Sequence, residues 1–192
     1  MGDAACYSRR LDRAIALATD AFRHTRRKDT DIAYLSHLFQ VMVHVAEHGG
    51  DEDQLIAAVL HDYLEDIDGA TSEGLEREFG PRVARLVAAL SDATERPKPP
   101  WEDRKRAYLA HLRDAPAEVK LISAADKLHN AQSIRRDLEL VGDQVWDRFT
   151  ATREQTLWYY RELVEALAAG WTSRLLDRLR AEVDALHRSV QE

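Results

Sequence analysis

The chain has 192 residues, of which 45% are hydrophobic and 32% are charged, and its formal net charge is -7. This length and composition are typical of a soluble globular protein with a substantial core, and the negative charge argues against a broad nucleic-acid surface. No apolar run approaches the ~20 residues that a membrane span needs, no signal peptide is evident, and the single Cys6 fits a reducing cytoplasm.

Hydrophobic residues recur with a helical period along nearly the whole chain, and no segment alternates as a strand would. We therefore expect an all-α fold, a multi-helix single domain covering residues 1–192. The predicted helices cover, in chain order, about 8–24, 34–47, 51–68, 71–79, 81–90, 101–112, a segment opening at 116, 153–167 and 172–187. The proline-rich segment 97–100 is predicted to be a loop.

The C-terminal segment 171–190 carries one apolar stripe at helical spacing. Its members are Leu175, Leu176, Leu179, Val183 and Leu186. We expect this helix to pack on the domain as a cap. A homo-oligomer formed through the same stripe is the alternative.

The most unusual segment is His61-Asp62, followed by Glu65-Asp66, directly after the apolar run 55–60. In one continuous helix Asp62 would lie one turn from both later acids, at a cost of roughly 0.2–0.5 kcal/mol per pair of like charges. Acids at a helix C-terminus also oppose the helix dipole. Local stability does not explain this cluster, whereas a bound divalent cation would.

Two further polar residues interrupt apolar helices, His37 in the segment 35–39 and Asp126 in the segment 122–128. Imidazole and carboxylate ligands together suit manganese, iron or zinc. Each residue also has a simpler reading. His37 alone is typical of a core histidine with one hydrogen bond, Asp126 can pair with Lys127, and the acids after Asp62 can form a solvated helix end.

The ordered set of these residues resembles the HD-domain phosphohydrolase superfamily, whose metal ligands follow the order H…HD…D. It is most similar to the hydrolase domain of RelA/SpoT-type alarmone enzymes and to the small stand-alone hydrolases, over about residues 10–168. Four motifs carry the resemblance: Arg27-Lys28 before Tyr34-Leu35-Ser36-His37; Leu60-His61-Asp62 with Glu65-Asp66; Phe79-Gly80 before Val83-Ala84-Arg85-Leu86-Val87; and Ala125-Asp126-Lys127-Leu128-His129-Asn130.

The resemblance implies a role for each matched position. One Mn2+ ion would be held by His37, His61, Asp62 and Asp126. Glu65 and Asp66 would position and activate the attacking water. Arg27 and Lys28 would contact the base and phosphate of a nucleotide, and Asn130 and Ser133 would face its base and sugar.

The resemblance implies a cytoplasmic enzyme of the stringent response that hydrolyses the 3′-pyrophosphate of ppGpp or pppGpp. Three departures concern substrate shape: Leu38 replaces a proline, the loop 29–33 lacks glycine, and Thr156 replaces an aromatic residue. They leave open an adenine substrate, either ppApp or the 2′-phosphate of NADPH. A generic HD-type nucleotide phosphohydrolase and a non-catalytic nucleotide-binding protein are further alternatives. The remaining length has no room for a synthetase domain.

Overall fold

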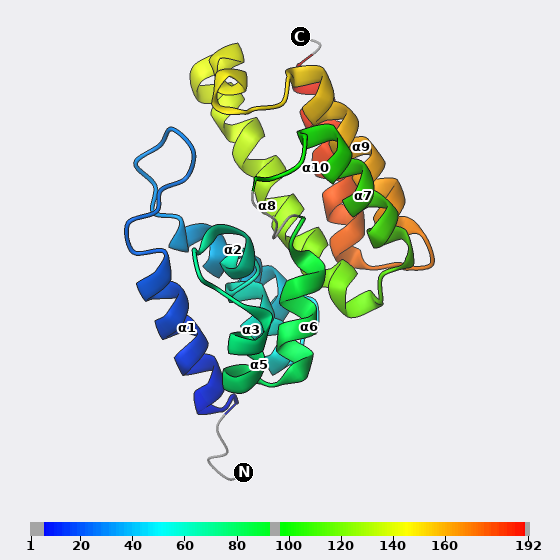
Figure 1. Cartoon of the computed structure of the whole chain (residues 1–192). Helices are drawn as coiled ribbons and strands as arrows, with labels where there is room; N and C mark the ends of the chain where they lie inside the picture. Colours follow the sequence, from blue (N-terminus) through cyan, green and yellow to red (C-terminus); the bar gives the residue numbers. More distant parts are fainter. Residues whose placement is uncertain (1–5, 93–96, 191–192) are drawn as a thin grey trace. The chain divides into compact units, whose positions relative to one another are not determined.

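The computed structural model describes residues 6–92 and 97–190, and the chain divides into two compact units, with the boundary in the sequence between Ser91 and Asp92. Within the described residues all regular elements are helical, apart from one isolated bridge between Arg26 and Ala33 (Figure 1). The predicted all-α fold is confirmed. The single-domain organisation stays a prediction.

The first unit is built around α3, which packs against α1, α2 and α6, while α5 packs against α6. Its helices are α1 (Arg9–Ala21), α2 (Leu35–Glu47), α3 (Glu52–Val59), α4 (Tyr63–Asp66), α5 (Ser72–Phe79) and α6 (Pro81–Leu90). The four consecutive apolar residues from Ile56 to Val59 explain the central position of α3, because burying all of them requires packing on every side of the helix.

Short polar residues begin these helices as the sequence predicts. The Ser8 side chain accepts a hydrogen bond from the Arg10 amide at the start of α1. Asp51 and Gln54 form a reciprocal capping box on α3, and Thr71 caps α5. Gly80, with φ of 90°, separates α5 from α6 in a conformation that side chains disfavour.

One predicted element is wrong: the continuous helix over 51–68 is interrupted at Leu60–Asp62. α3 ends at Val59, a turn follows, and α4 is a separate single turn. The ring Nδ1 of His61 lies 2.8 Å from the Ala58 carbonyl oxygen, and the Tyr63 amide donates to the Leu60 carbonyl. These local hydrogen bonds replace the helical pattern, which hydrophobic periodicity alone does not reveal.

The basic loop between α1 and α2 folds back on itself. The Arg27 amide donates to the Ile32 carbonyl at 2.9 Å, and the Tyr34 amide donates to the Thr25 carbonyl at 2.9 Å. Arg26 and Asp31 form an ion pair across the loop. Asp29 takes a positive φ of 49°, so the turn forms without the glycine that the sequence lacks there. Arg27 and Lys28 therefore lie on an ordered turn.

The second unit is built around α8, which packs against α9, α10 and η1, while α7 packs against α9. Its elements are α7 (Trp101–Asp114), α8 (Ala117–Val141), η1 (Gly142–Arg148), α9 (Arg153–Ala168) and α10 (Arg174–Ser189). The whole apolar stripe of α10 is buried, and this helix contacts α8 and α9. None of the described helices combines the length and the apolar character needed to cross a membrane.

Candidate functional site

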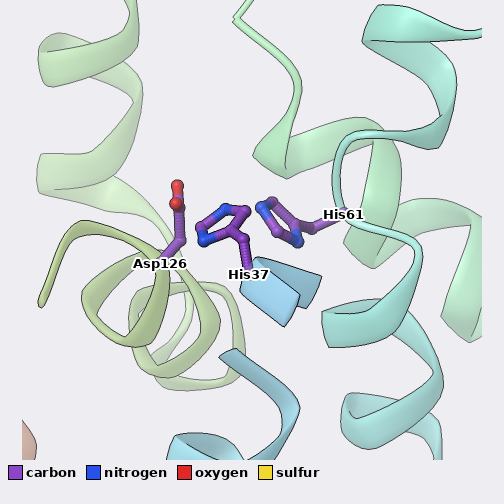
Figure 2. A group of neighbouring side chains, drawn as sticks. All are labelled: His37, His61 and Asp126. Carbon is purple, nitrogen blue, oxygen red and sulfur yellow. The ribbon is translucent and has the colours of Figure 1, made fainter. Parts of the chain in front are cut away.

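His37 and His61 form the centre of the site in the first unit. Both side chains are buried, with 1% and 4% of their surface exposed. His37 lies in the first turns of α2 and His61 in the turn after α3, and their rings are 5.1 Å apart in an edge-to-face arrangement (Figure 2). A ring nitrogen of each lies within 4.8 Å of one from the other. The start of α2 and the turn after α3 therefore bring together two potential metal ligands within one unit.

The backbone fixes which nitrogen of His61 can bind a cation. Its Nδ1 lies 2.8 Å from the Ala58 carbonyl oxygen, which can only accept a hydrogen bond. Nδ1 must therefore carry the proton, and Nε2 presents a lone pair in the neutral ring. Metal-binding histidines commonly have this arrangement, because the donated hydrogen bond sets both the tautomer and the ring orientation.

Asp62 brings a carboxylate to both rings. Its Oδ2 lies 3.0 Å from Nε2 of His61 and 3.8 Å from Nε2 of His37. A carboxylate oxygen and an imidazole lone pair this close repel each other unless a proton or a cation lies between them. The donor set of two imidazoles and one carboxylate therefore fits a divalent transition metal.

Tyr34 belongs to the site, although sequence reasoning gave it no role of its own. Its hydroxyl donates a hydrogen bond to Oδ2 of Asp62. Its ring stacks on Phe22 at 5.3 Å between centroids and meets the edge of His37 at 5.4 Å. The available signal was its position in the motif Tyr34-Leu35-Ser36-His37, one helical turn before the histidine.

Arg27 lies next to this aromatic group. Its guanidinium carbon is 5.9 Å from the centre of the Tyr34 ring, within the range of a cation–π contact. Arg27 is half-buried and Lys28 is exposed. The loop therefore brings at least one of the two predicted substrate-binding cations close to the histidine pair.

Glu65 and Asp66 lie in α4, whose turn starts at Asp62. The Asp66 amide donates to the Asp62 carbonyl at 2.9 Å, so the predicted spacing of one turn is present. Because α4 is a separate single turn, however, the acids do not lie at the C-terminus of a long helix. The expected dipole penalty was therefore wrong, and of the two arguments from helix stability only the repulsion between neighbouring acids still favours a cation.

In the second unit, Asp126 is buried on α8 and both of its carboxylate oxygens have partners. Lys127 forms an ion pair with Oδ2, and the side-chain amide of Asn130 donates to Oδ1. Burial alone would lower the pKa of Lys127, but the Asp126 carboxylate and the phenols of Tyr159 and Tyr108 hold that pKa well above its ordinary value. Lys127 is therefore a permanent cation beside Asp126 at neutral pH.

The two predicted substrate contacts on α8, Asn130 and Ser133, form hydrogen bonds within that helix. Asn130 contacts Asp126, so its amide orients a carboxylate in this structure. The hydroxyl of Ser133 donates to the His129 carbonyl at 2.9 Å and is buried. That hydroxyl retains its lone pairs, with which it can still accept a hydrogen bond.

Comparison with known proteins identifies the family. The HD domain model matches residues 14–157. The chain is 31% identical to the zebrafish (Danio rerio) guanosine-3′,5′-bis(diphosphate) 3′-pyrophosphohydrolase MESH1, over 93% of this chain and 88% of that protein. It is 33% identical to the Drosophila melanogaster MESH1, over 90% and 87%. The bifunctional (p)ppGpp synthase/hydrolase SpoT of Escherichia coli is 33% identical over 66% of this chain but only 18% of its own length.

The comparison with solved structures supports the same family. The metazoan ortholog of SpoT that hydrolyses ppGpp superposes with a TM-score of 0.77 and 28% identity, covering 97% of this chain and 98% of that one. The structure of lmo0812 from Listeria monocytogenes has a TM-score of 0.72 and 28% identity, covering 79% and 99%. An HD domain implies a bound divalent metal ion. The chain therefore belongs to the HD-domain family of metal-dependent phosphohydrolases, and it is similar over most of its length to the metazoan SpoT-type hydrolases.

Proposed function

We propose that this enzyme is a Mn2+-dependent hydrolase of the 3′-pyrophosphate of ppGpp and pppGpp, acting in the cytoplasm. The observation that carries the proposal is the approach of Oδ2 of Asp62 to the Nε2 atoms of His61 and His37, in a chain whose relatives are named as ppGpp 3′-pyrophosphohydrolases. The products would be GDP or GTP and pyrophosphate.

The proposed metal ligands are His37, His61 and Asp62 of the first unit and Asp126 of the second. Burial of His37 and His61 supports this set, because a buried polar side chain needs a partner that offsets its desolvation. Asp126 is buried as well and also contacts Lys127 and Asn130. Mixed imidazole and carboxylate ligands favour manganese over magnesium. When bound, such an ion polarises a phosphoryl oxygen and makes water easier to deprotonate.

The chain's own groups would then perform the proton transfer. The oxygen of water forms a bond to the phosphorus next to O3′, and the bond between that phosphorus and O3′ breaks. We assign Glu65 as the base that takes the proton from water, because it lies on the turn that starts at Asp62 and is half-buried. Asp66, one residue further and exposed, would orient the same water. The departing O3′ takes up one proton, so the products balance.

Arg27 and Lys28 are the proposed contacts to the nucleotide. A planar guanidinium can stack on a base, and Arg27 already lies against the Tyr34 ring, whereas Lys28 offers a compact charge to phosphate. Asn130 and Ser133 are proposed to contact the base and sugar. For Asn130 this role would accompany its hydrogen bond to Asp126.

The test is turnover of ppGpp, ppApp and NADPH by the purified full chain with Mn2+, with the products separated by chromatography. Asp62→Ala is the inactive control, and Asp68→Ala, an exposed acid just after α4, is the matched active control. GDP and pyrophosphate from ppGpp would support the proposal. Products from ppApp or NADPH alone would show that the substrate is an adenine nucleotide and not ppGpp. No turnover of any 3′-phosphorylated nucleotide would reject the function.

A further inference from the structure

A cavity lies beside α4, the single turn that carries Glu65 and Asp66, and Tyr63 of this turn lines it. It has a volume of about 410 Å³ and is formed entirely within the first unit. Its walls come from α1, from Tyr63 of α4 and from α5 with the segment before it. This volume is within the range of small-molecule sites. None of the proposed metal ligands or substrate contacts lines it.

Two opposite charges line this cavity. Arg77 and Glu78 are consecutive residues of α5, and both are exposed. Consecutive helical residues do not face each other, so the two side chains present separate charges rather than neutralising one another. Burial, and then the Glu78 carboxylate, raise the pKa of the Tyr63 phenol, so Glu78 lies close to Tyr63 in the cavity wall.

The rest of the lining is mixed in character. Leu75 is buried and Leu17 is half-buried, and together they contribute the apolar part of a lining that is mostly polar. Tyr63 adds a half-buried phenol.

We infer that this cavity binds a small zwitterion of the α-amino acid class. A guanidinium recognises a carboxylate through paired hydrogen bonds, which matches the carboxyl group to Arg77. An ammonium group would be attracted to the Glu78 carboxylate. The apolar part of the lining, made by Leu17 and Leu75, would contact the side chain of the ligand.

A ligand bound in this cavity would also affect hydrolysis at the active site. This part of the inference rests on the proposed function. Tyr63 directly follows Asp62 and shares the single turn of α4 with Glu65 and Asp66. A ligand held against Tyr63 stabilises that turn, because a single helical turn has little stability of its own. We therefore expect the bound zwitterion to change the hydrolysis rate without competing with the nucleotide.

The experiment is calorimetric titration of the full chain with free α-amino acids, independent of any activity. Each binding amino acid is compared with its 2-hydroxy acid, which lacks the ammonium, and with its amide, which lacks the carboxylate. Arg77→Gln and Glu78→Gln should each weaken binding about tenfold or more, the loss expected for one charged hydrogen bond. Glu76→Gln and Arg85→Gln are exposed controls outside the cavity and should leave binding unchanged.

Four results would overturn the inference: no saturable binding of any amino acid, equal binding of the hydroxy acid, equal binding of the amide, or binding that survives both charge variants. If the zwitterion binds as described but the hydrolysis rate is unchanged, the site stands and its regulatory role is rejected. Because binding is measured separately, failure of the proposed hydrolysis would leave the cavity result intact.

Discussion

The hydroxyl of Tyr34 donates a hydrogen bond to the carboxylate of Asp62, 28 residues further along the chain. The same ring stacks on Phe22 and touches His37, so its position is fixed from two sides. Tyr34 therefore orients a carboxylate between the two histidines without being a ligand itself. Groups that orient metal ligands in this way commonly matter nearly as much as the ligands.

Removing only this hydroxyl should weaken the metal site. We expect Tyr34→Phe to keep the ring contacts and the fold, and to lower metal affinity or activity by about 10- to 100-fold. Mn2+ titration followed by calorimetry measures the affinity. Tyr7→Phe, at a tyrosine that is 52% exposed, is the control. Unchanged affinity and turnover in Tyr34→Phe would show that the Tyr34 hydroxyl is not required to orient the Asp62 carboxylate.

The metal should stabilise the folded chain through Asp62. A ligand present at 100 times its dissociation constant adds about 2.7 kcal/mol to the free energy of unfolding. We expect the melting temperature of the wild-type chain to fall when a chelator removes the metal, and that of Asp62→Ala to be insensitive to the chelator. Asp68→Ala should respond like the wild type. A chelator response that persists in Asp62→Ala would place the metal elsewhere.

Glu65 should affect turnover and not metal binding. Loss of a general base typically costs about 10²- to 10⁴-fold in rate, so Glu65→Gln should lower kcat by that factor and keep the stabilisation by Mn2+. Steady-state kinetics and melting with and without metal give the two values. Glu73→Gln, an exposed acid on α5, should behave as the wild type. If Glu65→Gln instead abolishes metal binding, the glutamate is a ligand and not the base.

Arg27 should act on substrate binding. Lysine keeps the charge but cannot stack as a planar group. We therefore expect Arg27→Lys to raise KM about tenfold, a cost of about 1.4 kcal/mol, with kcat nearly constant. Arg23→Lys, an exposed residue just after α1, is the matched control. An unchanged KM would mean that Arg27 serves only the packing of its loop.

The sequence predicted the helices and the polar residues at the site for physical reasons. Helical periodicity and short polar caps are local signals, and Ser8, Thr71 and Pro81 begin helices as expected. His37 was visible as a polar residue within an apolar helix, and it is buried. Such an intruder is costly unless it has a partner, and therefore stands out in a sequence.

The sequence could not show which partners would reach these residues. The turn at His61 depends on a hydrogen bond from its ring to the Ala58 carbonyl, which competes with the helix at a position where the apolar pattern continues. The contact between Tyr34 and Asp62 joins two distant segments. Asn130, whose predicted contact with the nucleotide stays a prediction, donates to Asp126 one turn earlier on the same helix. Each of these depends on side-chain geometry that hydrophobic patterns do not encode.

The environment of Asp92 predicts how the stability of the second unit changes at acidic pH. Its side chain is 6% exposed and contacts Arg104 at 2.7 Å and also Lys105. Burial alone would raise the pKa of Asp92, but Lys105 and then Arg104 outweigh burial and hold that pKa below its ordinary value of 3.8. A carboxyl group with a lowered pKa in the folded state contributes stability above its unfolded pKa. This contribution is lost as the pH falls through the folded value.

We therefore expect Asp92→Asn to lower the free energy of unfolding by about 3 kcal/mol at neutral pH, because two cations lose a buried partner. The difference from the wild type should shrink as the pH falls below about 3.8. All four tryptophans lie in the second unit, so denaturation followed by their fluorescence reports on this unit. Asp184→Asn, an exposed position on α10, should show no such pH-dependent difference. A destabilisation by Asp92→Asn that is the same at every pH would show that the side chain acts by packing and not by its charge.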